Sequence, residues 1–202
     1  MSYSIEPAYL FHNELAGLLF KASINPINKW FFADGCFSAE SDLERSPNTW
    51  LHENCVVIEN REIVAYCESY WSKPLNIISN FRLIIFNKKK GVIVTKALFD
   101  YFEYLFVSRG CKAVNWLVAE KNYHAHRIYE KFIHHYFGHN VGKRHNGQMA
   151  YNGEISDVFL YEVTDEEYFK WKKKNNLLQQ HRMVKNESLT TQQKSIKNCC
   201  FQ

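Results

Sequence analysis

The chain has 202 residues, enough for one domain with a well-buried core and too few for two of ordinary size. Aromatic residues make up 16% of the sequence, so a packed core is expected and global disorder is excluded. The formal net charge is +4, but residues 176–202 carry four cations and one acid, which leaves only +1 for the rest. Bulk charge therefore gives no reason to expect a nucleic-acid partner.

The sequence favours a reduced, cytoplasmic chain. Its six cysteines show no zinc-like spacing, residues 1–6 have no signal-peptide pattern, and no apolar run is long enough for a transmembrane segment. The polar residues 176–202 are expected to form a flexible basic tail. The tail ends in a C-a-a-X shape in which Cys199 would carry a prenyl anchor, although neither Cys200 nor Phe201 is aliphatic.

The first part of the chain predicts a strand, helices and then consecutive strands. A helix is expected over 12–20 with Asn13 as its cap, a second over 38–43, and a further turn over 49–52. The polar residues 59–62 have the length of a hairpin turn. Branched and aromatic residues predict strands over 3–7, 55–58, 63–70 and 76–86.

A basic turn joins the strand that ends at Phe86 to a helix. The turn reads Lys88-Lys89-Lys90-Gly91, and apolar residues at helical spacing follow from Val94 until the helix closes before Gly110. Unpaired N–H groups and the dipole make such a helix start attractive to phosphate, and a glycine lets a ligand approach the backbone. The alternative is an ordinary strand-to-helix turn with solvated lysines. Neither G-x-x-x-x-G-K-[ST] nor G-x-G-x-x-G is present.

The second part of the chain completes a mixed sheet. The strand at 113–119 lies between two helices in sequence, so it is expected to run parallel to the strand ending at Phe86. The helix after it, over 122–137, has Asn122 at its N-cap position. A hairpin of strands 141–150 and 157–163 is expected next, followed by a last helix over 164–174.

This order of elements resembles the GNAT superfamily of N-acetyltransferases over residues 3–173, and two motifs carry the resemblance. The first is the acyl-CoA pyrophosphate loop, Arg/Gln-x-x-Gly-x-Gly/Ala after a strand. Gly91 fits this motif, and Lys88 replaces its first residue. Ile93 places a branched side chain where the family has glycine or alanine.

The second motif is Asn-x-x-Ser/Ala-x-x-x-Tyr-Glu-Lys, which Asn122, Ala125 and Tyr129-Glu130-Lys131 match. The Gly-Phe that usually follows is missing, and Phe132-Ile133-His134-His135 stands there. The segment 157–163 resembles the last hairpin of the ribosomal-protein and small-amine acetyltransferases of this family.

The resemblance implies a single α/β domain over residues 1–175, with a mixed, mostly antiparallel central sheet whose central strands splay and are flanked by helices. It also implies an acetyl-CoA-dependent N-acetyltransferase in which a primary amine attacks directly in a ternary complex. Tyr129 would protonate the leaving thiolate; its alternative role is that of a core aromatic. The residues implied in acetyl-CoA binding are Ile85, Phe86, Lys88, Lys89, Lys90, Gly91, Val92, Ile93, Asn122 and Ala125.

The base and the acceptor are less determined. Glu68 stands where the family often places its base, and alternation puts it on one face with Tyr66 and Tyr70 without deciding which face. Asp157 is a candidate for binding the substrate amine, and His139 and His145 are further candidate bases. No metal site is expected, because the histidines lack a ligand pattern.

A small-molecule or peptide amine is expected as the acceptor. The sequence leaves open which amine this is and whether the chain forms a homodimer. The rival hypothesis is a catalytically degenerate module of the same fold that serves as an interaction domain. Ile93 and the missing Gly-Phe favour that rival, whereas Asn122 and Tyr129 favour the enzyme.

Overall fold

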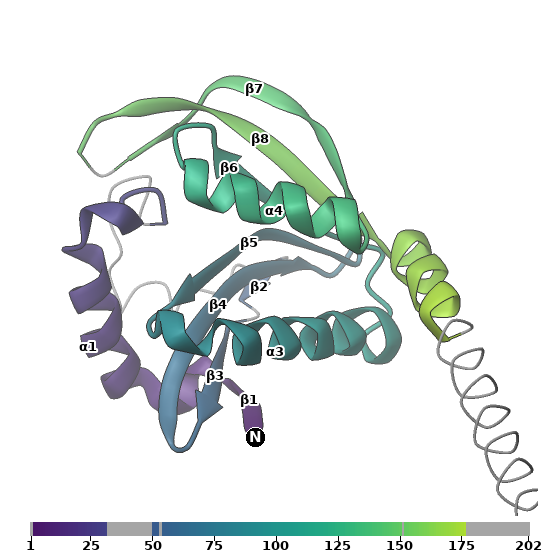
Figure 1. Ribbon diagram of the computed structural model, residues 1–202, viewed down its shortest axis with the longest axis horizontal. Helices are drawn as coiled ribbons and strands as arrows, with labels where there is room; N and C mark the ends of the chain where they lie inside the picture. The colour runs from purple at the N-terminus through teal and green to yellow at the C-terminus, as the bar shows by residue number, and fades with distance from the viewer. Residues whose placement is uncertain (1, 32–49, 53, 151, 177–202) are drawn as a thin grey trace, which may run out of the picture. The chain divides into compact units, whose positions relative to one another are not determined.

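The computed structural model describes residues 2–31, 50–52, 54–150 and 152–176 (Figure 1). The strands are β1 (Tyr3–Pro7), β2 (Trp50–His52), β3 (Cys55–Glu59), β4 (Glu62–Ser72), β5 (Ile77–Ile85), β6 (Ala113–Ala119), β7 (His139–Met149) and β8 (Ile155–Thr164). The longer helices are α1 (His12–Ser23), α3 (Gly91–Glu103) and α4 (Tyr123–His135).

The described residues 166–176 belong to a second unit, distinct from that of residues 1–165, and they continue a helix that covers 165–176. The helix predicted over 38–43 and all but the first residue of the predicted tail, Cys199 included, lie outside the described residues. In the described ranges, no helix has both the length and the apolar character needed to span a membrane.

The described strands form one mixed sheet. Their order is β1-β3-β4-β5-β6-β8-β7, and β2 pairs with the far end of β4. Only β5 and β6 run parallel; every other described pair is antiparallel. The predicted fold class and the predicted parallel pair are both confirmed.

The two parallel strands pair over a short length and then part. Their register contains only Ile77 opposite Ala113 and Ile78 opposite Val114. Just beyond this point β5 holds one residue more than β4, because the partner of β4 shifts between Glu68 and Tyr70. Such a bulge bends a strand and increases its twist, so β5 turns away from β6 where the pairing ends.

Helices cover both faces of the sheet. Leu15 and Leu19 of α1 pack with Tyr66 of β4 on one face. Ala65, the sequence neighbour of Tyr66, points to the other face and packs with Val94 of α3. The helix α4 lies on the same face as α3, as Figure 1 shows. Aromatic rings join the two helices: those of Phe99 and Phe102 lie 5.9 and 6.1 Å from that of Phe132.

Two local predictions were wrong. Residues 50–52 form the strand β2 rather than a turn, because they pair with Tyr70–Ser72 of β4. The helix α1 begins at His12, and the residue at its N-cap position is Phe11, with no side-chain cap, so Asn13 does not cap it. The predicted cap of α4 is confirmed, because the side chain of Asn122 accepts the Ala125 N–H at 3.3 Å.

Candidate active site

The basic turn follows the C-terminal end of β5, where β5 and β6 no longer pair. Asn87 opens the turn, its side chain accepting the Lys89 N–H at 3.1 Å, and α3 begins at Gly91. The backbone of Gly91 has an ordinary helical φ of −54°, and a Cβ there would have no neighbour within 4 Å. Neither backbone conformation nor packing therefore requires glycine at this position, which leaves the approach of a ligand as a physical reason for it.

The three lysines of the turn differ in their surroundings. Lys88 and Lys89 are exposed, whereas Lys90 forms an ion pair with the buried carboxylate of Glu59. The charge of Lys90 is thus already paired within the fold. Lys88 and Lys89 remain as the lysines whose charges can face a phosphate.

Ile93 does not obstruct the turn. Its side chain is 6% exposed and packs beneath α3 against Val57, Val64 and Ala65. Only its backbone N–H, in the first turn of α3, remains for a ligand. The obstruction that its branched side chain suggested is therefore not present, because the helix turns that side chain into the core.

At the end of β5, the backbone N–H and C=O groups of successive residues face opposite edges of the strand, one toward β4 and the other toward β6. The Phe86 N–H donates to the Val64 carbonyl of β4 at 2.9 Å, so this amide is not available to a ligand. Because successive residues of a strand direct their backbone groups to opposite edges, those of Ile85 and Leu83 point away from β4, toward the parting. Of the two predicted strand-end contacts, the geometry favours Ile85 over Phe86.

Tyr129 lies on α4 above the parting of β5 and β6. Its ring is 5.2 Å from that of Trp116 on β6 and 6.0 Å from that of Tyr161 on β8. Burial, and secondarily the nearby Cys67 thiol, raise the pKa of Tyr129 well above its ordinary value of 10.0. The hydroxyl makes no hydrogen bond to any residue that the structure describes. It is therefore a protonated donor at neutral pH whose proton is not committed to a partner.

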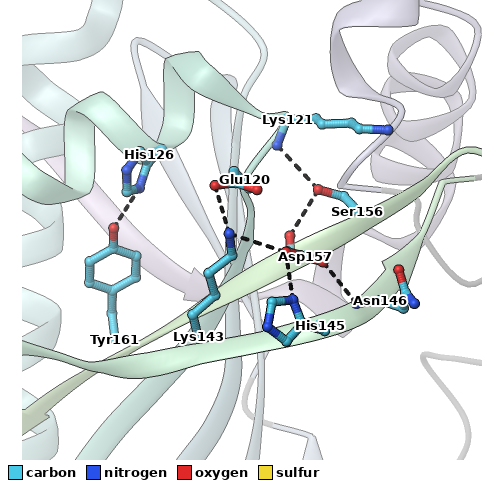
Figure 2. Close-up of polar contacts among 9 residues, drawn as sticks. All are labelled: Glu120, Lys121, His126, Lys143, His145, Asn146, Ser156, Asp157 and Tyr161. Atoms are coloured by element: carbon cyan, nitrogen blue, oxygen red, sulfur yellow. Dashed lines mark hydrogen bonds and ion pairs between the residues drawn. The ribbon is translucent and has the colours of Figure 1, made fainter.

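Tyr161 has the opposite character and was missed by the sequence reasoning. It is fully buried, and its hydroxyl lies 2.6 Å from Glu130 Oε1. The same hydroxyl lies 2.6 Å from His126 Nδ1, as Figure 2 shows. The hydroxyl has one proton, so donating it to Glu130 requires His126 to donate its Nδ1–H in return. The i, i+4 spacing of His126 and Glu130 indicated that both lie on one face of α4, but it did not name their partner.

Glu68 and Tyr129 lie on opposite faces of the sheet. Glu68 shares the face of Tyr66, which packs against α1, and is 3% exposed. The Tyr70 hydroxyl donates to Glu68 Oε1 at 3.1 Å, and Arg82 is its cross-strand neighbour. The two predicted catalytic residues are thus not in contact, and the parting of β5 and β6 lies between the faces that carry them.

Asp157 is already surrounded by donors, as Figure 2 shows. Its carboxylate accepts the Asn146 N–H at 3.0 Å and lies 3.1 Å from Lys143 Nζ and 3.0 Å from His145 Nδ1. The Asn146 N–H, then Lys143, then His145 lower the pKa of Asp157 to about 2. An amine substrate would have to compete with these donors. Glu120, 2.9 Å from Lys143 and more exposed, is a carboxylate of this cluster that sequence reasoning missed.

The other predicted features lie as follows. Ala125 is half-buried in the first turns of α4, and Val92 is exposed at the start of α3. In the described part of the chain, no three His, Cys, Asp or Glu side chains converge as metal ligands would.

The sequence matches no protein-family model, and no curated protein matches it by sequence. Solved structures do match. A variant of the spermidine N-acetyltransferase of Vibrio cholerae has a TM-score of 0.60 at 15% identity, over 83% of this chain and 96% of that one. The ribosomal-protein-S18-alanine N-acetyltransferase of Escherichia coli has a TM-score of 0.51 at 15% identity, over 81% and 94%. A probable acetyltransferase has a TM-score of 0.60 at 17% identity, over 82% and 94%. Likeness at this level of identity shows a shared fold.

Proposed function

We propose that this chain, which has the fold of the GNAT acetyltransferases, is an acetyl-CoA-dependent N-acetyltransferase that acts on a primary amine by direct attack in a ternary complex. The observation that carries the proposal is the parting of β5 and β6 between a basic helix start and an uncommitted tyrosine hydroxyl. The basic helix start suits the anionic pyrophosphate end of an acyl-CoA. The tyrosine hydroxyl suits the other end, which carries the thioester and from which a thiolate leaves.

Several groups of this chain fit acetyl-CoA, which supplies an activated thioester when bound. The Gly91 N–H already donates to the Lys88 carbonyl, so the exposed Lys88 and Lys89 and the N–H groups of Val92 and Ile93, in the first turn of α3, would hold the pyrophosphate. The backbone of Ile85, directed toward the parting, would pair with the amides of the pantetheine arm. Asn122 and Ala125 begin α4, where the cap orders the backbone and the small side chain leaves space.

The two proton transfers are assigned to two residues that lie on opposite faces of the sheet, Glu68 and Tyr129. An amine with a pKa near ~10.4 must lose a proton before it attacks, and Glu68 is the proposed acceptor of that proton. Tyr129 is proposed to donate its proton to the leaving thiolate. Its raised pKa keeps the hydroxyl protonated at neutral pH, so that the donor form is the one present.

The acceptor is proposed to be a small-molecule or peptide amine. Two of the similar structures are enzymes whose acceptors are spermidine and a ribosomal-protein alanine, which spans both types. We propose that the reaction takes place in the cytoplasm. The buried free thiols of Cys55, Cys67 and Cys111 are compatible with that reducing compartment. The interaction-module alternative is weakened, because the side chain of Ile93 is turned into the core.

Calorimetry with acetyl-CoA and a panel of amines tests the proposal. Gly91→Val should abolish acetyl-CoA binding while keeping the melting temperature, since a side chain there meets nothing in the fold. Tyr129→Phe should keep acetyl-CoA affinity and lower kcat by about 10²–10³, as expected for the loss of one general acid. Unchanged acetyl-CoA affinity in Gly91→Val, or an equally active Tyr129→Phe enzyme, would contradict the respective assignment.

A further inference from the structure

The indole N–H of Trp116 is a buried donor without an acceptor in the described part of the chain. Trp116 is 2% exposed, so bulk water does not replace a partner. Leaving a buried donor unpaired costs roughly 1–3 kcal/mol, and buried polar groups are nearly always hydrogen-bonded. By contrast, the indole N–H of Trp71 donates to Asn76 Oδ1 at 3.0 Å. The unpaired donor of Trp116 therefore requires an explanation.

Trp116 lies where β5 and β6 part. It stands two residues beyond Val114, the last residue of β6 that pairs with β5. Its ring is 6.4 Å from that of Phe81 on β5, in an edge-to-face arrangement, and 5.2 Å from that of Tyr129. The side chain thus touches both the diverging strand and the residue proposed as the acid.

No described polar group near Trp116 accepts its indole N–H. The hydroxyl of Tyr161, whose ring stacks on Trp116 at 5.9 Å, is occupied by Glu130 and His126. An indole nitrogen only donates, so the missing partner must be an acceptor atom. A carbonyl oxygen is the acceptor that an acyl-pantetheine arm carries along its length, in two amides and in the thioester.

We propose that the indole N–H of Trp116 donates a hydrogen bond to a carbonyl oxygen of the acyl-pantetheine arm when acyl-CoA is bound. This inference rests on the proposed function. It adds a side-chain donor from β6 to the backbone groups assigned above. If the acceptor is the thioester carbonyl, the same donor also faces the oxyanion that develops there during attack.

The direct test uses the full chain labelled with nitrogen-15, whose five tryptophans give up to five indole signals in a proton–nitrogen correlation spectrum. Trp116→Phe and Trp71→Phe assign two of them. Saturating acetyl-CoA should move the Trp116 indole proton downfield and slow its exchange with solvent, while the Trp71 signal stays in place. The same shift with CoA alone identifies a pantetheine amide as the acceptor, and a shift with acetyl-CoA only identifies the thioester.

Affinity gives an independent measurement. Trp116→Phe should weaken acetyl-CoA binding by about 3- to 10-fold, the loss expected for one net hydrogen bond, and Trp71→Phe should leave it unchanged. If the Val92 and Ile93 amides respond to acetyl-CoA but the Trp116 indole does not, the inference is overturned and the cofactor site stands. If no resonance responds to either compound, the proposed function fails and this inference fails with it.

Discussion

The two neighbouring tyrosines beside Trp116, Tyr129 and Tyr161, offer a test of which hydroxyl supports the fold and which supports the chemistry. In Tyr161→Phe the ring keeps its place against Trp116 and Tyr129, but Glu130 and His126 lose their shared partner. In Tyr129→Phe no hydrogen bond to a described residue is lost. The two substitutions remove the same atom from neighbouring rings, so each is the control for the other.

The magnitude follows from the bonds that are removed. A hydrogen bond to a charged group contributes about 1.5–3 kcal/mol net, so we expect Tyr161→Phe to lower the free energy of unfolding by about 2 kcal/mol. For a chain of 150–250 residues, 1 kcal/mol corresponds to about 2–4 °C, which predicts a fall of about 4–8 °C in melting temperature. Tyr129→Phe should change the melting temperature by less than about 2 °C, because the ring still fills its space.

Differential scanning calorimetry on both variants, together with acetyl transfer at saturating substrate, measures the two effects side by side. We expect Tyr161→Phe to lose mainly stability and Tyr129→Phe to lose mainly kcat. An unchanged melting temperature in Tyr161→Phe would refute the reasoning, since its hydroxyl would then not hold α4 to β8. A large loss of stability in Tyr129→Phe would show that its hydroxyl has a structural partner.

Three further predictions concern charges and thiols. Lys90→Ala should lower the free energy of unfolding by about 3 kcal/mol, because it leaves the buried Glu59 unpaired, whereas Lys89→Ala should not; denaturant titration of both variants checks this. The pKa of Asp157 is lowered from 3.8 to about 2, so its contribution to stability is complete above about pH 5 and is lost as the pH falls toward 2; an acid limb unaltered in Asp157→Asn would contradict this. The Cys67 thiol has a raised pKa because it is hydrogen-bonded to Cys55 and buried. Iodoacetamide at pH 8 should therefore label Cys67 only after unfolding, which mass spectrometry would measure.

Much of the local structure around the candidate site was predicted from the sequence because its signals are local. The cap of α4 depends on Asn122 and an amide three residues later, and the basic turn depends on an abrupt change from strand to polar residues. The parallel pairing of β5 with β6 followed from the helix between them. Each of these features is specified within one element and its connections, where periodicity, capping and chirality act directly.

The tertiary structure decided which partner each polar group takes. The sequence by itself determined the order of the elements other than β2, the starts of α3 and α4, and the position of Tyr129 on α4. It did not determine that β2 is a strand, because three residues carry no periodicity and their pairing depends on β4, 18 or more residues away. The face of Glu68, the pairing of Lys90 with Glu59 and the partners of Tyr161 were likewise settled only in the fold. Strand alternation gives relative faces but not which face meets which helix, and hydrogen bonds between distant elements follow from packing that no local pattern encodes.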